Sequence, residues 1–361
     1  MLRAFIVVIG LAGLLAPPNS ASVFAASMYW DTSSAGGLQA GDGTWDGNTT
    51  AMWSDDIAGS DPLLAWTSSL DDAYFHANGT SLVTVSGTNV GAAGVIFDGT
   101  GYTIGSQRIT VGAGGIVANE SATMYGVTLG ASQSVTVATD KTLTLGQATS
   151  FSADRTWTKQ GAGTLNTAAI NVGNTAGTTG TLAMSEGTLN VGSTLILGAT
   201  VGSSTGIFNM SGGEINVSSV MYLGHIGSGI VNQTGGTVNL NSSQGLRVCT
   251  DSTDATGVYN LDGGVLRTRA IGTNPKTPDN RTMRLSFGGG TLEHTGSGLM
   301  TPAIPFEFKA GGGTISIPDS AATMHLTHAI TGTGTGWLTK TGAGTLIVEA
   351  GTFGGVIVSG G

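Results

Sequence analysis

The chain has 361 residues, of which 61 are glycine and only 10% are charged, and its formal net charge is −9. The acidic balance argues against nucleic acid and against an anionic membrane surface as partners. Val, Ile, Leu and Thr recur in short alternating runs, which argues against disorder and predicts an all-β chain. Cys249 is the single cysteine, so an internal disulfide is excluded and stability has to come from backbone pairing and stacked apolar rows.

Residues 1–25 have the pattern of a secretory signal peptide. One positive charge, at Arg3, precedes an apolar run from 4 to 16, and Val23 and Ala25 suit the two specificity positions of a cleavage site. The apolar run is shorter than the ~20 residues that span a bilayer, and nothing later in the chain is apolar enough to cross one. We therefore expect an exported protein, secreted or at the cell surface, with no transmembrane segment in its mature chain.

A repeat of about 25 residues runs through 180–292. Its copies begin at Gly180, Gly206, Gly229, Gly257 and Met283, and a period of this length is typical of solenoids. Strand side chains alternate with period two, so residues two and four places after each start share one face, which we expect to point inward. The inward positions of the first strand are Leu182, Phe208, Val231, Tyr259 and Leu285, followed by Met184, Met210, Gln233, Leu261 and Phe287. A second strand begins its inward row at Leu189, Ile215, Val238, Leu266 and Leu292.

Glycine-containing turns are expected between the two strands, at 186–187, 212–213, 235–236, 263–264 and 289–290. A third apolar element closes three copies, at 195–198, 221–224 and 246–249. Three short strands per coil predict a single-stranded right-handed parallel β-helix, or β-solenoid. The competing architecture is a sandwich of antiparallel hairpins, which explains the turns but not why matching positions keep their residue type.

Asparagines recur between the inward positions of both strands. In stacked coils like residues lie ~4.8 Å apart, so their amides are expected to hydrogen-bond from coil to coil. The alternative is a flat ligand-binding face, which would usually add aromatic residues that these rows lack. The two rows are Asn209, Asn232 and Asn260 on the first strand and Asn190, Asn216 and Asn239 on the second.

Six of the 13 basic residues fall between 247 and 284, and several flank the Pro-containing loop GTNPKTPDNR at 272–281. We expect this loop to bulge and to replace the third strand of its coil. A basic loop on an acidic solenoid is a candidate site for an anionic glycan or a neighbouring chain, and the alternative is a solvated loop with scattered charges. The candidate residues are Arg247, Arg267, Arg269, Lys276, Arg281 and Arg284.

The sequence predicts no catalytic, cofactor-binding or metal site, and no cofactor. Ser204 lies in a formal Gly-x-Ser-x-Gly match, but the following glycine opens the next β coil, whereas that motif works on a strand-to-helix turn. His325 and His328 lack the adjacent glutamate and third ligand of a zinc site. A carbohydrate-active β-helix enzyme would need carboxylates clustered on successive coils. The densest acids instead lie near the N-terminus, at Asp55, Asp56, Asp61, Asp71 and Asp72.

Two segments, TKQGAGTLNT at 158–167 and TKTGAGTLIVEAGTFGGVIVSGG at 339–361, share Lys-x-Gly-Ala-Gly-Thr-Leu. This motif strongly resembles the autotransporter-associated β-strand repeat, also called the passenger-associated transport repeat. The second copy continues as that pattern does, with Phe353, a glycine pair and a short strand at 356–358. The head at 26–81 is similar to the start of many large exported proteins with such repeats, which open on spaced tryptophans, here Trp30, Trp45, Trp53 and Trp66.

The resemblance implies a bacterial surface stalk or passenger, non-enzymatic, whose repeat assists its own passage through, or folding outside, the outer membrane. We expect a small Trp-containing N-terminal β cap at 26–81 and β-helical repeats from 82 to 361. The chain stops at Gly361 in mid-repeat, so we expect a C-terminal truncation and membrane attachment through a missing C-terminal module. The alternative function is a glycan-binding adhesin, with surface polysaccharide or other cell-surface proteins as partners, and a less favoured one is a carbohydrate-active enzyme.

Overall fold

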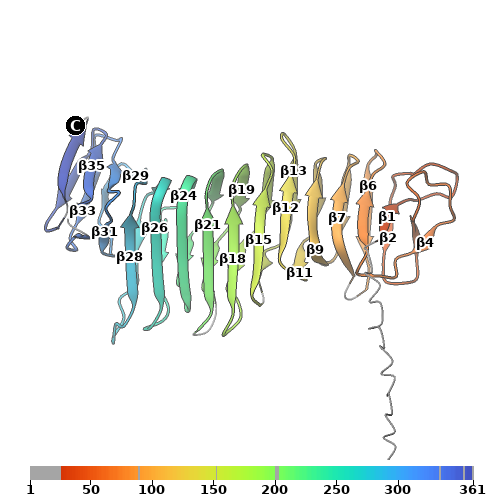
Figure 1. Ribbon diagram of the computed structural model, residues 1–361, viewed down its shortest axis with the longest axis horizontal. Coiled ribbons are helices and arrows are strands. Elements are labelled where there is room, and N and C mark those ends of the chain that lie inside the picture. Colours follow the sequence, from red (N-terminus) through yellow and green to blue (C-terminus); the bar gives the residue numbers. More distant parts are fainter. Residues whose placement is uncertain are drawn as a thin grey trace, which may run out of the picture.

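A computed structural model of the chain describes residues 26–87, 90–151, 153–199, 203–332, 335–352 and 354–359. The expected signal peptide at 1–25 lies outside the described residues, as do Phe353 of the second motif copy and Gly361. Every regular element within the described ranges is a strand, and the strands stack along one long axis into a β-solenoid (Figure 1).

Column 1 of the solenoid is a parallel stack that carries the first strand of each repeat. It begins with β1 (Ser27–Trp30), which pairs with β5, and its register is continuous through the repeat region. Its other strands are β5 (Asp72–Phe75), β7 (Gly91–Phe97), β9 (Ile109–Ala118), β12 (Gln133–Val137), β15 (Arg155–Gln160), β18 (Thr179–Met184), β21 (Thr205–Met210), β24 (Ser228–Leu240), β26 (Thr256–Thr268), β28 (Thr282–Phe287), β31 (Phe306–Phe308) and β34 (Thr331–Gly332).

Column 2 carries the second strand of each repeat and includes the C-terminal halves of β24 and β26. Its other strands are β2 (Gly43–Trp45), β6 (Ser81–Val85), β8 (Tyr102–Gly105), β10 (Ala122–Met124), β13 (Thr142–Leu145), β16 (Thr164–Thr167), β19 (Thr188–Val191), β22 (Glu214–Val217), β29 (Thr291–His294), β32 (Gly313–Ser316), β35 (Trp337–Thr341) and β37 (Gly355–Ser359).

Column 3 carries the third apolar element of the repeats. It starts with β11 (Val127–Leu129), which pairs with the first residues of β9. It continues as β14 (Thr149–Ser150), β17 (Ile170–Val172), β20 (Leu195–Leu197), β23 (Met221–Leu223), β25 (Leu246–Val248) and β27 (Ile271–Gly272), and then as a separate sheet of β30 (Leu299–Met300), β33 (Thr323–Leu326) and β36 (Thr345–Val348).

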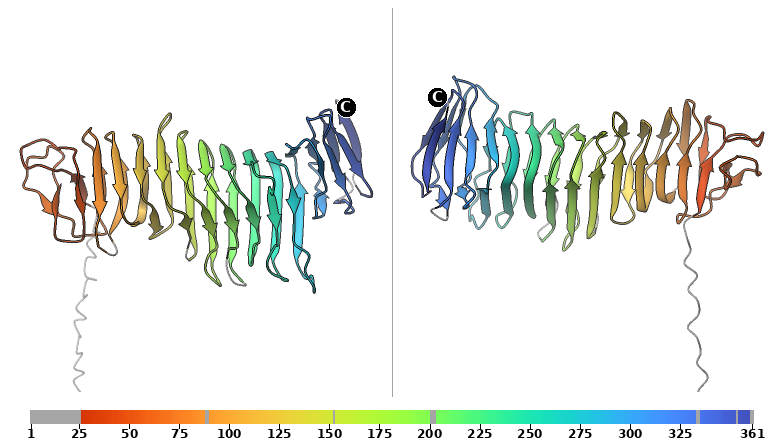
Figure 2. Two further views of the ribbon diagram at one scale, coloured as in Figure 1. Left: turned by 180° about the vertical axis from the view of Figure 1, so that it is seen from behind. Right: turned by 45° about the horizontal axis from the view of Figure 1, so that its top comes forward.

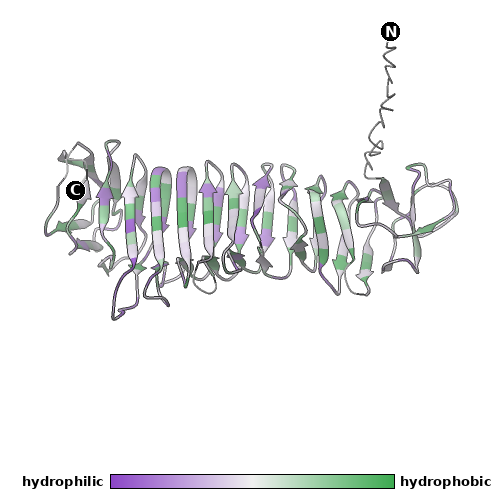
Figure 3. Cartoon of the chain, turned by 60° about the horizontal axis from the view of Figure 1, so that its bottom comes forward, coloured by the Kyte–Doolittle hydropathy of each residue, from purple (hydrophilic) through white to green (hydrophobic). Residues whose placement is uncertain are grey.

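The inward rows of the repeat are confirmed by register and burial. Leu182 pairs with Phe208, which pairs with Val231, and all three are fully buried. In column 2, Leu189, Ile215 and Val238 stack in the same way and are equally buried. Apolar and polar residues alternate along the strands (Figure 3), as a core enclosed by three sheets requires.

The glycine pairs are bends in some coils rather than turns between strands. β24 and β26 each run as one 13-residue strand through Gly235–Gly236 and Gly263–Gly264, with register shifts where the glycines lie. The second glycine of each pair has a positive φ, 71° at Gly236 and 69° at Gly264, which side chains disfavour. The glycine is therefore needed at the corner although the strand continues through it.

The loop at 272–281 also differs from its predicted position. The third strand of its coil is kept as β27, which pairs with β25, and the loop follows it before β28 begins. Ile271 keeps its buried position in the core, so the coil closes before the chain leaves it.

The N-terminal end of the core is closed by tryptophans. β3 (Ala51–Ser54) pairs antiparallel with both β1 and β4 (Leu64–Ala65), against the direction of the shaft. Trp30, Trp45 and Trp53 are fully buried, and their rings pack edge to face, with centroids 5.3 Å apart for Trp30–Trp53 and 5.0 Å for Trp45–Trp53. Because β1 and β2 already pair in parallel with β5 and β6, the stack begins inside 26–81. At the other end, the last coils turn away from the line of the shaft (Figure 2).

Candidate functional site

The six predicted basic residues lie on different faces of the solenoid. Arg284 is on β28 in column 1, Arg267 is in the column 2 part of β26, and Arg247 is on β25 in column 3. The loop after β27 carries the others, Lys276 and Arg281, while Arg269 follows β26 directly. The three columns face different directions, so the structure brings only some of these residues together.

Arg267 and Arg269 line one surface hollow with a volume of about 250 Å³. Both arginines are exposed, and the other lining residues are Asn239, Leu240, Asn241 and Thr295. The Arg267 Nε donates to Glu293 Oε1 at 3.1 Å, so the Glu293 carboxylate already offsets part of the positive charge of Arg267. The arrangement offers guanidinium and amide donors to a small anionic group.

Arg284 and Arg247 have local partners outside this hollow. The Arg284 Nε lies 3.3 Å from Glu307 Oε2 on β31, one coil further on. The Arg247 guanidinium lies over Gly272, where an added Cβ would come within 2.6 Å of it. Sequence reasoning missed the acidic partners Glu293 and Glu307, although the coil period alone places Glu293 beside Arg267.

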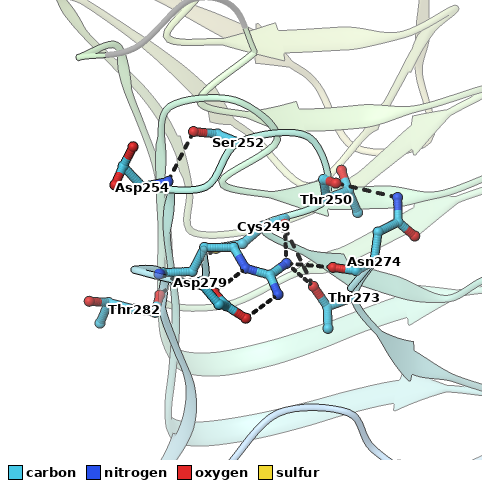
Figure 4. Close-up of polar contacts among 9 residues, drawn as sticks. Cys249, Thr250, Ser252, Asp254, Thr273, Asn274, Asp279 and Thr282 are labelled. Atoms are coloured by element: carbon cyan, nitrogen blue, oxygen red, sulfur yellow. Dashed lines mark hydrogen bonds and ion pairs between the residues drawn. The ribbon is translucent and has the colours of Figure 1, made fainter. Parts of the chain in front are cut away.

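Arg281 binds several groups in and beside the loop after β27, and Figure 4 labels its partners Cys249, Thr273, Asn274 and Asp279. Its side chain is only 2% exposed, and its Nη1 donates to Cys249 O at 2.6 Å and to Thr273 Oγ1 and Asn274 O at 2.7 Å each. Its Nε and Nη2 donate to the two carboxylate oxygens of Asp279. These bonds lower the pKa of Asp279 to about 2 and raise the pKa of Arg281. These hydrogen bonds hold the loop in place, so the role of Arg281 is to stabilise the folded loop.

Cys249 lies beneath this loop and is fully buried. Burial raises the pKa of its thiol to about 12, which keeps it protonated at neutral pH.

The asparagine ladders are confirmed. In column 2, Asn190 donates to Asn166 at 2.9 Å, Asn216 to Asn190 at 3.0 Å, and Asn239 to Asn216 at 2.8 Å. In column 1, the amides of Asn209, Asn232 and Asn260 are linked in the same way at 2.9 Å. The Lys309 Nζ continues this row, 3.3 Å from Asn260 Oδ1 and 2.8 Å from Asp262 Oδ1. The side-chain amides of these rows therefore link successive coils by hydrogen bonds.

The shared Lys-x-Gly-Ala-Gly-Thr-Leu segments have the same local geometry. The buried Lys159 Nζ donates to Gly161 O at 2.6 Å, and Lys340 Nζ donates to Gly342 O. Both glycines have positive φ, 74° and 83°. A Cβ at Gly163, the second glycine of the first copy, would come within 2.1 Å of Ala138 O in the preceding coil. In the motif, the lysine thus binds a carbonyl of its own tight corner, and in the first copy the second glycine lies against the preceding coil.

The two copies nevertheless lie in different columns. Lys159 is on β15 in column 1, whereas Lys340 is on β35, which pairs with β32 in column 2. The same lysine-to-carbonyl hydrogen bond therefore occurs at two different corners of the coil.

The remaining chemical motifs do not gather into a site. Ser204 is buried, and Gly202 of its motif lies outside the described residues. His325 pairs with Glu349 at 2.8 Å across one coil step. Within the described ranges, no group of three or more His, Cys, Asp or Glu residues could hold a metal ion. Four surface hollows have volumes of about 250 to 350 Å³, and no aspartate or glutamate lines any of them. They lie at the C-terminal end, on column 1, at Arg267 and beside the cap.

Comparisons with protein-family models, with curated proteins and with solved structures gave no match for this chain. In the part of the chain that the structure describes, no helix is long and apolar enough to cross a membrane. The fold is that of a parallel β-helix repeat protein, a stack of parallel coils.

Proposed function

We propose that the chain is an exported structural protein without enzymatic activity. It acts as a bacterial surface stalk or passenger of the autotransporter-associated type, which assists its own secretion and displays loops outside the cell. The observation that carries this proposal is the unbroken stacking of columns 1 and 2 from the tryptophan cap to β34 and β37.

The stacking supports the proposal because each coil pairs its strands with those of the coils directly before and after it, so folding can propagate from one coil to the next. A chain that leaves a membrane in an extended form can then fold coil by coil without a disulfide. The asparagine ladders add coil-to-coil hydrogen bonds to the backbone pairing, and each buried lysine holds the corner of its own coil.

Export is tested by expressing the chain with and without residues 1–25 in a Gram-negative host, followed by fractionation and protease treatment of intact cells. We expect the complete chain to leave the cytoplasm and to lose residues 1–25. Ala25→Asp is the matched control, because it should block cleavage while the rest of the chain is unchanged. A complete chain that stays in the cytoplasm would contradict the proposal.

A second candidate function, adhesion to acidic glycans, is favoured by the hollow at Arg267 and Arg269. Heparin serves as the anionic probe and dextran as the uncharged control. We expect Arg267→Gln combined with Arg269→Gln to abolish salt-sensitive retention on heparin, because both guanidinium groups in the lining are removed. Arg284→Gln, which removes an arginine paired on another face, should leave retention unchanged. Equal retention of all three proteins would exclude the hollow as the site.

A further inference from the structure

A histidine stands in the buried core row of column 2. The row passes in register through Val217, Leu240, Thr268 and His294, one residue from each coil. His294 is the last residue of β29 and is only 2% exposed. A titratable ring therefore occupies a core position that leucine and valine hold two and three coils earlier.

The hydrogen bonds of His294 decide which ring nitrogen carries the proton. Its Nε2 lies 3.0 Å from Gly298 O, and because a carbonyl oxygen can only accept, Nε2 must donate. The Gly296 N–H donates to Nδ1 at 3.3 Å, so Nδ1 must be without a proton. The folded corner at 295–298 therefore requires the neutral ring with its hydrogen on Nε2.

A second proton on the ring is incompatible with this corner. It would sit on Nδ1 and face the Gly296 N–H, so two donors would meet where one acceptor is needed. A Cβ added at Gly296 would lie 2.8 Å from the ring carbon Cε1, so the corner packs closely on the ring. The charged ring would also be buried, which costs free energy when the charge is unpaired. Protonation of His294 therefore requires the corner to open.

The charged groups on the neighbouring segments do not offset a charge on His294. None of the ion pairs among the described residues includes it. On its own strand, Glu293 pairs with Arg267 at 3.1 Å, and Arg269 lies in the segment after β26 in the preceding coil. In the following coil, the Asp319 Oδ1 accepts a backbone N–H of its own turn at 2.9 Å. These groups are positive or already bonded.

Three other histidines are placed to gain from a proton. Each lies beside a carboxylate of the next coil, and a protonated imidazole attracts a carboxylate. The strand β33, packed against the corner, carries one of these pairs. The pairs are His76 with Asp98 at 3.6 Å, His225 with Asp251 at 2.7 Å, and His325 with Glu349 at 2.8 Å. Acid thus tightens these coil-to-coil contacts, whereas it disrupts the corner at His294.

The corner at 295–298 lies where column 3 is interrupted. β27 is the last strand of the first sheet of this column, and β30, directly after the corner, begins the separate sheet with β33 and β36. Gly298 O, which accepts from His294, also accepts from Thr323 N of the next coil at 3.1 Å. The coils beyond turn away from the line of the shaft (Figure 2). Opening of this corner therefore loosens the junction between the shaft and the coils that begin at β30.

We propose that His294 is a pH-sensitive latch between the shaft and the coils that begin at β30. Its neutral ring holds the corner at 295–298 closed, and its protonation in a mildly acidic medium opens the corner. The solenoid then yields at one defined joint in acid, while its histidine-carboxylate pairs are strengthened.

Hydrogen exchange of the purified chain at pH 7.5 and 5.5, read by mass spectrometry and corrected for the intrinsic effect of pH on exchange, tests the proposal. Imidazoles take up protons in this window, whereas most carboxylates stay ionised. We expect peptides covering 290–300 and 320–326 to lose protection at least tenfold at pH 5.5, because the amides of Gly296 and Thr323 lose their acceptors. A peptide covering 188–191 in the shaft should keep its protection.

His294→Gln separates the latch from other effects of acid, since its amide keeps one donor and one acceptor but takes up no proton. Its protection at 290–300 should no longer depend on pH. His294→Leu, with the residue that β24 has at this row position, gives the same readout if the first variant does not fold. His225→Gln is the matched control and should keep the acid-induced loss at 290–300. Unchanged protection of the unmodified chain at pH 5.5, or an equal loss in a variant without the His294 ring, would overturn the proposal.

Discussion

The first and the last described layers of the solenoid differ in how far they cover the same core. At the N-terminal end, antiparallel β3 and a cluster of buried tryptophans leave no inward row open. At the C-terminal end, β37 continues the parallel direction of the shaft, and its valines remain exposed. A repeat that stacks on itself carries no signal to stop, so closure needs residues from outside the repeat pattern.

We expect the largest loss of stability from a substitution in the middle of the shaft, where each inward position is covered by a coil on both sides. Ile215→Asp should destabilise the fold by at least ~4 kcal/mol, because it places an unpaired carboxylate in the fully buried row of column 2. The measurement is the midpoint of urea unfolding. Ile207→Asp is the control, since Ile207 lies on the outward face of β21, and equal losses for the two variants would mean that the inward and outward faces are not distinguished.

The ends themselves are compared by removing one tryptophan from each. Trp53→Ala should cost ~3–5 kcal/mol, because it leaves a cavity in the cap. Trp337→Ala should cost less than ~1 kcal/mol, because that side chain is 51% exposed near the open end. Thermal unfolding of both variants measures the difference, and similar losses would show that the two ends are equally closed.

A smaller effect is the pH dependence of stability at the Lys159 corner. Burial lowers the pKa of Lys159 from 10.5 to about 8, with the Glu186 carboxylate opposing the shift. Between these two pH values the unfolded chain binds the extra proton, so the free energy of unfolding should rise with pH, by up to ~3 kcal/mol.

Lys159→Met should remove this rise, and urea unfolding from pH 7.5 to 10.5 measures it as the difference between the variant and the unchanged chain. Lys340→Met serves as the control, since it alters the same corner in the open C-terminal layer. A rise that persists in Lys159→Met would assign the pH dependence to other groups.

Periodicity predicted the interior of the shaft because burial acts on every coil in the same way. Leu182, Phe208 and Val231 could be assigned to one row from their spacing alone, and the amide ladder followed from the same register. Features set by one corner were harder to predict. β24 and β26 pass through their glycine pairs as continuous strands, and β27 persists before the loop at 273–281, since local backbone angles decide both.

The candidate site was less predictable than the fold. Six basic residues close in sequence fall on three faces, because neighbours in a coil of about 25 residues are separated by corners. Only Arg267 and Arg269 share a hollow, while the guanidinium of Arg281 is committed to Cys249 O and its own loop. The column of each lysine corner could not be predicted either, since it depends on the lengths of the loops before it.

The asparagine ladders also have a direction. Asn190, Asn216 and Asn239 each donate toward the N-terminus, and Asn190 and Asn216 also accept from the C-terminal side. The amides of column 1 follow the same order. Aligned amide dipoles strengthen one another along such a chain. Within these coils, the last asparagine of a partly assembled ladder would present a side-chain oxygen without a donor, so growth from the N-terminus would offer the next asparagine a hydrogen-bond acceptor.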